Sequence, residues 1–347
     1  MYIKLMNDEN INIYIKFWLV LITSLVGLMI IVGGLTRLTD SGLSITRWEL
    51  ISGILPPFTY DQWNNAFSLY KEIPEYKLLN FSMTLNEFKT IYWWEYAHRL
   101  LGRLIGILYL LPLIFFTIKK SFSKKLLFSF YFIFFLILLQ GFMGWYMVKS
   151  GLTERTDVSH YRLSAHLTLA FIIFIMLFWN LFKLQKKENL DEYKKLPFYL
   201  PVFFLIIILA QISFGAFVSG LDAGKIYTTW PLMNNSYFPD DSLYIDIFST
   251  EIFSNPSIVQ FIHRNMAYAI FFVFIIILFT VFKNSNFNYM RKNCLIIFLI
   301  LILQIFLGIL TVVSGAQIFL ASLHQIGSIF LIIASLRLVF INTKETN

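Results

Sequence analysis

Residues 198–219 read FYLPVFFLIIILAQISFGAFVS, a run of twenty-two positions without a charged side chain. A helix needs about 20 mostly apolar residues to cross the hydrocarbon core of a bilayer. Eight stretches meet this requirement: roughly 17–36, 97–118, 126–148, 163–184, 198–219, 260–282, 294–315 and 318–340. Helices are the expected spanning form, because backbone groups in lipid must be satisfied within the segment. The sequence therefore predicts an all-α integral membrane protein with eight transmembrane helices.

The composition agrees with this fold class. The chain is 58% apolar and 14% charged, whereas soluble domains are about 45–50% apolar and about 25% charged. The net charge of +8 is then a property of cytoplasmic loops rather than a nucleic-acid-binding surface. The single cysteine, Cys294, excludes an internal disulfide and every metal or iron–sulfur site built on cysteine pairs.

The positions of Lys and Arg predict the orientation in the membrane. With the N-terminus inside, the inner segments hold sixteen of the 28 basic residues: Lys4, Lys16, Lys119, Lys120, Lys124, Lys125, Lys183, Lys186, Lys187, Lys194, Lys195, Lys283, Arg291, Lys292, Arg337 and Lys344. Cytoplasmic loops carry such an excess, so both termini are predicted to be cytoplasmic. The first sixteen residues contain acidic residues and no Arg, unlike a mitochondrial transit peptide. We therefore expect a bacterial inner membrane.

The chain repeats itself once. Four matches occur in the same order: Asp40-Ser41-Gly42 with Asp222-Ala223-Gly224, Tyr96-Ala97-His98-Arg99 with Phe261-Ile262-His263-Arg264, Gln140 and Gly144 with Gln304 and Gly308, and His166 with His324. The offsets are 182, 165, 164 and 158 residues, and they change only where outer loops differ in length. The repeat predicts two four-helix bundles, residues 1–190 and 191–347. Because each half has an even number of helices, a pseudo-twofold axis along the membrane normal should relate them.

Four of the five histidines follow this repeat. His98, His166, His263 and His324 each lie near the start of an even-numbered helix, so all four should lie near the outer surface at one depth. Ionisable residues in a span are costly and usually functional. Two neutral imidazoles on facing helices suit the axial positions of a haem iron, whereas zinc requires three or four ligands. We expect one porphyrin site in each half, formed by His98 with His166 and by His263 with His324. His160 has no counterpart and is expected to be a solvated loop residue.

Arginines accompany the first histidine of each pair. Arg99 and Arg264 directly follow His98 and His263, and a guanidinium can bind a haem propionate with two parallel hydrogen bonds. Ordinary interfacial snorkelling is the alternative. Arg37 and Arg47 in the outer loop are weaker candidates of the same kind.

One difference between the halves suggests unlike roles. Glu95 lies one helical turn before His98, and the equivalent position in the second half is Gln260. A carboxylate beside one haem and an amide beside the other indicate that one site performs chemistry while the other transfers electrons. Alternatively, Glu95 provides favourable charge near a helix N-terminus.

At these residues the chain resembles the haem A synthase family, also called CtaA/COX15. The matching motifs are residues 33–44 (GGLTRLTDSGLS) with Trp48 and residues 55–57, residues 95–99 (EYAHR) with Gly102-Arg103, Gln140-Gly141 to Gly144-Trp145, residues 150–152, residues 161–167 (YRLSAHL), residues 215–224 (GAFVSGLDAG), His263-Arg264 and residues 323–325. The resemblance covers about residues 15–340. Some family members have a cysteine pair in the first outer loop, which this chain lacks, so it is similar to the proteobacterial and mitochondrial branch.

The resemblance implies a haem-dependent membrane oxidoreductase that oxidises the C8 methyl of haem O to a formyl group through hydroxylated intermediates. The product, haem A, serves cytochrome oxidase assembly. By this resemblance Glu95, His98 and His166 are the catalytic residues at the substrate haem, and His263 and His324 hold a haem b. The implied partners are the farnesyltransferase that makes haem O, an unidentified electron-transfer partner and membrane lipid. The oligomeric state stays open, with a homo-oligomer as one option.

Two other classes of protein fit the sequence less well. A diheme b-type electron-transfer cytochrome would also use two histidine pairs, but it gives no reason for Glu95 in one half to be replaced by Gln260 in the other. A transporter would be expected to place its polar groups near the midplane, whereas these histidines lie toward the outer side.

Overall fold

The computed structural model describes residues 9–49, 52–153, 155–184, 194–250 and 252–343. Its α-helices are α1 (Glu9–Leu38), α2 (Tyr60–Tyr70), α3 (Pro74–Leu78), α4 (Leu85–Ile118), α5 (Lys124–Gly151), α6 (His160–Leu184), α7 (Tyr199–Gly220), α8 (Pro256–Lys283), α9 (Asn288–Val313) and α10 (Ile318–Asn342). The 3₁₀ helices are η1 (Ser52–Ile54), η2 (Ala223–Lys225), η3 (Tyr244–Phe248) and η4 (Ser285–Phe287). The described residues form no strand. The all-α prediction is confirmed.

Eight of the helices in the described part of the chain are long and apolar enough to cross a membrane. They are α1 and α4 to α10, as the hydropathy of the sequence predicts. Four of the inner lysines, Lys4, Lys186, Lys187 and Lys344, lie outside the described residues.

The second span begins earlier than its apolar stretch. Hydropathy predicts a start at residue 97, but α4 begins at Leu85. Thr84 caps the helix, since its hydroxyl accepts the N–H of Glu87 and the Glu87 carboxylate accepts the N–H of Thr84. The first turns of α4 also pack on α2, where Phe88 stacks on Phe67 with ring centres 4.9 Å apart. Capping and aromatic packing therefore extend the helix through a polar segment that hydropathy leaves out.

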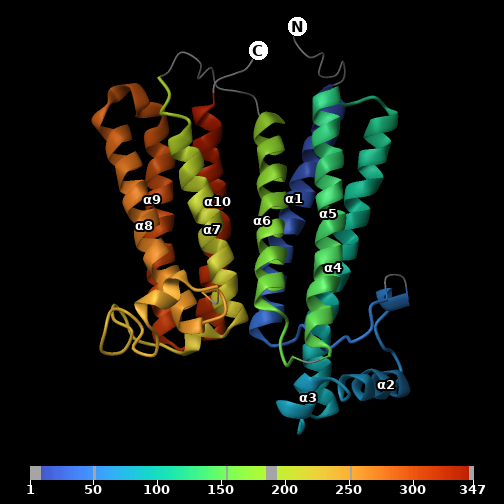
Figure 1. Ribbon diagram of the computed structural model, residues 1–347. Coiled ribbons are helices and arrows are strands. Elements are labelled where there is room, and N and C mark those ends of the chain that lie inside the picture. Colours follow the sequence, from blue (N-terminus) through green and yellow to red (C-terminus); the bar gives the residue numbers. More distant parts are fainter. Residues whose placement is uncertain (1–8, 50–51, 154, 185–193, 251, 344–347) are drawn as a thin grey trace. The chain divides into compact units, whose positions relative to one another are not determined.

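The chain divides into two compact units, one of residues 24–170 and one of residues 1–23 with 171–347. In the second unit α7, α8, α9 and α10 form a closed ring, in which each helix packs on the next and α10 packs on α7 (Figure 1). In the first unit α4 packs against α5 and against α2. The expected boundary between residues 190 and 191 lies outside the described residues. The division at that point and the pseudo-twofold axis stay predictions.

Polar side chains join neighbouring helices inside each unit. Gln140 of α5 donates to the carbonyl of His166 at 3.0 Å, and Gln211 of α7 donates to the carbonyl of His263 at 2.8 Å. These two glutamines thus tie α5 to α6 and α7 to α8 at the level of the histidines. Such bonds between spanning helices are worth about 0.6–2 kcal/mol each.

Candidate functional site

His263 and His324 face each other inside the second unit. Their ring centres are 6.4 Å apart and their planes are inclined at 82°. Metal–imidazole bonds of about 2.0–2.1 Å on both sides of one ion would place the ring centres about 6–6.5 Å apart. The two side chains therefore have the separation that a pair of axial ligands to one haem iron requires.

The four repeat-matched histidines share one ring orientation. In each, Nδ1 is enclosed by the residues that the structure describes. Each residue as a whole is nevertheless only half-buried, and Nε2 does not belong to the enclosed set. Nε2 is thus the nitrogen that each ring leaves available to a ligand. His98 and His166 lie close enough to interact electrostatically, so the first unit also brings its pair together.

A glycine on the preceding spanning helix lies against each of these rings. A Cβ placed on the glycine would lie within 3.3 Å of the imidazole Cε1 in all four cases: 2.9 Å for Gly33 and His98, 3.2 Å for Gly144 and His166, 3.3 Å for Gly215 and His263, and 3.1 Å for Gly308 and His324. Any larger residue would have to push the ring away. The sequence shows these glycines in the repeat, but not that they contact the histidines.

Substituting one of these glycines should therefore weaken binding of the haem that we expect at its histidine pair. We expect Gly144→Val to displace the His166 ring and to lower haem binding in the first half at least tenfold, as losses of ligand orientation commonly do by about 10–100-fold. The measurement is the difference absorption of purified protein titrated with haem. A Cβ placed on Gly141 of the same helix would meet no described atom within 4 Å, so Gly141→Val is the matched control. Equal binding by both variants would contradict this role of Gly144.

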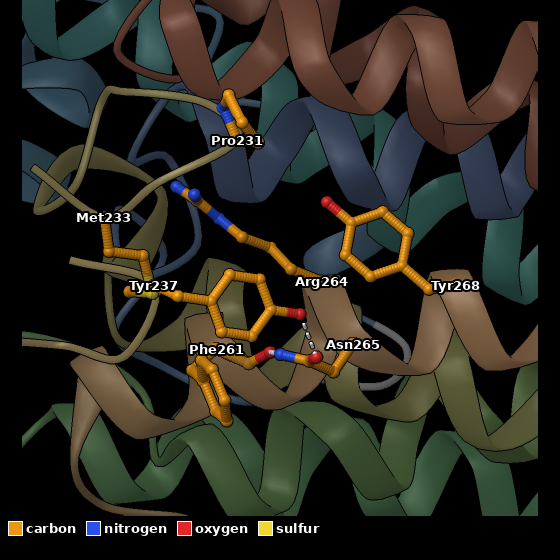
Figure 2. A pocket seen from close by; sticks show the side chains of 7 residues that line it. All are labelled: Pro231, Met233, Tyr237, Phe261, Arg264, Asn265 and Tyr268. Atoms are coloured by element: carbon orange, nitrogen blue, oxygen red, sulfur yellow. Dashed lines mark hydrogen bonds between the residues drawn. The ribbon is translucent and has the colours of Figure 1, made fainter.

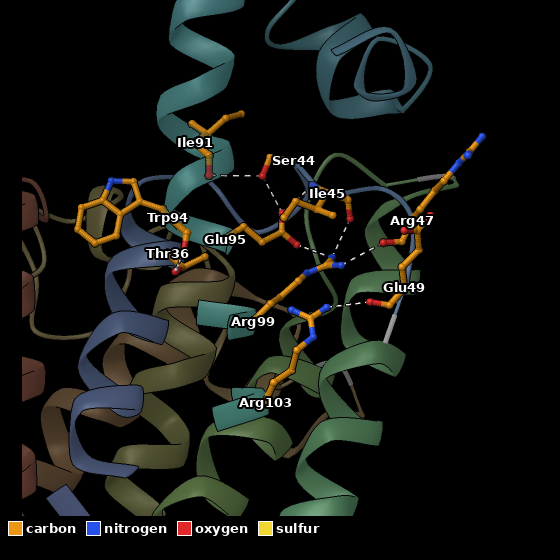
Figure 3. A network of polar contacts seen from close by, with 10 residues as sticks. All are labelled: Thr36, Ser44, Ile45, Arg47, Glu49, Ile91, Trp94, Glu95, Arg99 and Arg103. Carbon is orange, nitrogen blue, oxygen red and sulfur yellow. Dashed lines mark hydrogen bonds and ion pairs between the residues drawn. The ribbon is translucent and has the colours of Figure 1, made fainter. Parts of the chain in front are cut away.

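Glu95 is almost completely buried, at 2% exposure, and lies at the centre of a polar network in the first unit (Figure 3). Its Oε1 accepts from Arg99 Nη2 at 2.5 Å. Its Oε2 accepts from the Ser44 hydroxyl at 2.7 Å and from the Ile45 N–H at 2.8 Å. The carboxylate is thus paired with a cation and held by two further donors from the loop after α1.

Arg99 also binds the backbone of that loop. Its Nη2 donates to the carbonyl of Ile45 at 2.7 Å, and its Nη1 donates to the carbonyl of Arg47 at 3.2 Å. The next arginine on this face, Arg103, donates to the carbonyl of Glu49 at 2.8 Å. The structure therefore gives Arg99 a role in fixing the loop, and the expected contact with a propionate stays a prediction.

The second unit repeats this arrangement with different chemistry. Arg264 Nη2 donates to the carbonyl of Tyr227 at 2.8 Å and its Nη1 to that of Thr229 at 2.9 Å. These carbonyls are 182 residues after those that Arg99 binds. Gln260, in the place of Glu95, donates its Nε2 to the carbonyl of Tyr227 at 2.9 Å. As for Arg99, contact of Arg264 with a propionate stays a prediction.

Arg264 also borders a small depression in the second unit (Figure 2). Its lining residues are Pro231, Met233, Tyr237, Phe261, Arg264, Asn265 and Tyr268. Neither His263 nor His324 lines it. We therefore do not assign it as a haem site.

The prediction for His160 is wrong. It is the first residue of α6 and only 5% exposed, with its ring centre 4.4 Å from that of Tyr161. Helix α6 begins before its apolar stretch and takes this residue into the packed part of the unit. Of the two weaker arginine candidates, Arg37 pairs with Asp40 at 2.6 Å and Arg47 is exposed.

A buried carboxyl group in α3 was not predicted from the sequence. Glu75 is 5% exposed, and its Oε2 has no hydrogen-bond partner within the described residues. Burial, together with the nearby Asp157, Asp40 and Glu95 carboxylates, raises the pKa of Glu75 to about 8. A glutamate between Pro74 and Tyr76 carries no pattern that distinguishes it from a solvated one.

Comparison with known proteins gives one consistent result. The family COX15-CtaA, described as cytochrome oxidase assembly protein, matches residues 16–336. A "Heme A synthase" of Pelagibacter ubique is 50% identical over 340 residues, which are 97% of this chain and 99% of that protein. Proteins of the same description from Rickettsia bellii and Bradyrhizobium diazoefficiens are each 42% identical, over 91% and 90% of this chain and 94% and 86% of their own lengths.

Proposed function

The chain belongs to the COX15-CtaA family, and on that premise we propose that it acts as a haem A synthase. It would oxidise the C8 methyl group of haem O to a formyl group through hydroxylated intermediates, and the product would serve cytochrome oxidase assembly. This conversion is a four-electron oxidation, so it needs a route by which electrons leave the substrate. The observation that carries the proposal is the pair His263 and His324, whose spacing of 6.4 Å suits a haem iron.

We assign the two haems to different halves. His98 and His166 would bind the substrate haem O in residues 1–190, and His263 and His324 would hold a haem b in residues 191–347. A haem b bound there would supply one-electron transfer. The exchange of Glu95 for Gln260 supports this division, because only the first half places a carboxylate at this position next to its histidine pair.

Glu95 would act on the substrate through its charge. Oxidation of the methyl carbon develops positive charge, and a preorganised carboxylate in a low-dielectric site stabilises such charge strongly. The ion pair with Arg99 and the donors of the 44–45 loop support an ionised, fixed carboxylate. This role distinguishes the chain from a diheme electron-transfer cytochrome, and no separate observation favours that alternative.

The chain is a multi-pass membrane protein. We propose a bacterial inner membrane with both termini cytoplasmic, supported by the lysines at the C-terminal ends of α4 and α8, such as Lys119 and Lys283. His166, His263 and His324 lie about two turns into α6, α8 and α10, and His98 lies farther along α4, where its apolar part begins. Both haem sites would therefore lie toward the periplasmic side. Partners would be the farnesyltransferase that makes haem O, an electron-transfer protein or carrier, and membrane lipid. Nucleic acid is not an expected partner.

Identification of the extracted haems tests the proposed function. Purified from a host that makes haem O, the protein should contain haem B together with haem O, its hydroxylated form or haem A. The measurement is liquid chromatography with mass detection of the acid-extracted haems. Haem B as the sole haem would indicate an electron-transfer cytochrome, and a protein without haem would contradict both functions.

A further inference from the structure

The hydroxyl group of Ser44 donates to the Glu95 carboxylate at 2.7 Å. We infer that Ser44 is a positioning residue, which fixes this carboxylate against the substrate haem. This inference rests on the proposed function and adds to it a residue that acts through Glu95.

The geometry around the carboxylate shows what Ser44 contributes. Arg99 binds Oε1, whereas Ser44 and the Ile45 N–H both bind Oε2. Ser44 is 2% exposed. A second acceptor, the carbonyl of Ile91, lies farther from the hydroxyl, at 3.4 Å against 2.7 Å. Because the Glu95 carboxylate is both charged and nearer, the Ser44 hydroxyl donates its hydrogen bond to Glu95 rather than to the Ile91 carbonyl.

Two donors at one oxygen and a cation at the other fix the rotation of the carboxylate. If Arg99 were the only partner, Oε1 would be fixed, but the carboxylate group could still rotate and change the position of Oε2. Ser44 and Ile45 remove that freedom, and they also offset the cost of burying the charge. A group that stabilises developing charge must already be oriented before the reaction begins.

The second half of the chain provides an internal control. There Ile226 stands 182 residues after Ser44 and Gln260 stands 165 residues after Glu95. The loop is nevertheless held by Arg264 through the carbonyls that correspond to those of the first half. The Oε1 of Gln260 is buried and finds no donor in the described part of the chain. Holding the loop therefore does not require a hydroxyl at this position.

The first half thus has both the serine and the glutamate, and the second half has neither of them at the equivalent positions. Where the side chain is an amide, none of the described residues donates to its oxygen; where it is a carboxylate, a hydroxyl does. A purely structural role of Ser44 in the loop would be needed equally in both halves. The serine contact instead occurs only in the half that has the charged carboxylate. This is expected if Ser44 orients a group that acts in the reaction.

Ser44→Ala tests the inference in the purified, haem-loaded full chain. We expect the haem content to be retained, KM for haem O to be unchanged and kcat to fall about tenfold or more, the cost of one charge-assisted hydrogen bond. Rates are expressed per bound substrate, so that a loss of folded protein does not count as support. Ser44→Thr keeps a hydroxyl and should restore most of kcat.

Infrared difference spectroscopy gives a readout that does not depend on turnover. The Glu95 carboxylate band, identified by its disappearance in Glu95→Gln, should shift in Ser44→Ala. Ser41 is a matched control, because it is buried in the same loop and its hydroxyl contacts Thr39 instead of Glu95. Ser41→Ala should leave the band in place.

The outcomes separate this inference from the proposed function. If wild-type protein converts no haem O, the proposed function fails, and an unshifted band in Ser44→Ala would still overturn the contact between Ser44 and Glu95. If wild-type protein forms haem A and Ser44→Ala does so at an unchanged kcat, the positioning role of Ser44 is wrong while the function stands.

Discussion

Replacing Glu95 by Gln should lower haem A formation at least a hundredfold while the protein keeps its haem. The substitution preserves the volume of the side chain and gives the first half the residue that the second half has at Gln260. It removes the charge that we propose to stabilise the oxidised methyl carbon. Loss of one preorganised electrostatic group commonly costs about 10²–10³ in rate. Glu95→Ala should have the same effect on product and also leave haem binding largely intact.

The structure supports the expectation that Glu95→Gln still folds. Arg99 keeps its two carbonyl partners, Ile45 and Arg47, which do not depend on the carboxylate. The second unit holds its loop with an amide at the same position. The histidine pair of the first half should thus remain in place, and its haem absorption spectrum should be unchanged.

The measurement is the amount of haem A formed per bound haem O in membranes or purified protein, determined by chromatography. Glu87→Gln is the matched control, because Glu87 lies on the same helix, is exposed and contacts Thr84 at the cap. It should retain normal production. Haem A formation at the wild-type level in Glu95→Gln would show that Glu95 holds the loop and does nothing more.

Much of this architecture could be predicted from the sequence, because it depends on long apolar stretches and on a few ionisable residues within them. Apolar length alone predicts the eight spans, and the division of the chain into two halves with two histidines each pairs His263 with His324 before any contact is known. Burial within a bilayer leaves few positions for ionisable groups, so each one carries information.

The remaining features depend on packing that periodicity does not record. The early start of α4 follows from a cap at Thr84 and a stack between Phe67 and Phe88. In the sequence Ser44 is the last residue of the 33–44 motif, and nothing distinguishes it there from the other small polar residues of this segment. Its relation to Glu95 spans 51 residues and becomes visible only when the loop is seen to fold back onto α4.

The hydrogen-bond partners of the arginines also could not be predicted from the sequence. Position next to a histidine suggests propionate binding for Arg99 and Arg264, yet both have backbone carbonyls as partners in the structure. A guanidinium has five donors in a fixed fork. Which acceptors it meets depends on the loops that surround it, and the sequence does not specify the conformation of those loops.

Replacing His324 by Ala should remove haem b from the second half. It should also lower haem A formation at least a hundredfold, the factor expected for Glu95→Gln. The facing His263 would keep one axial position, but the ring that completes the 6.4 Å pair is lost. Even a change in a group that merely orients a metal ligand commonly costs about 10–100-fold in affinity, and removal of the ligand itself should cost at least as much. Electrons from the oxidised methyl group would then lack their route through the second half.

The spectrum and the product test these steps separately. In His324→Ala the low-spin absorption of bis-histidine haem b should disappear, while added haem O should still bind to His98 and His166. His160→Ala is the control, because this histidine is buried but belongs to neither pair; its variant should keep the haem b spectrum.

A His324→Ala protein that has lost haem b and still forms haem A at the normal rate would show that electrons leave the first half by another route. Retention of an unchanged bis-histidine spectrum would instead show that His324 is not the ligand, and the pairing predicted from the repeat would have to be abandoned.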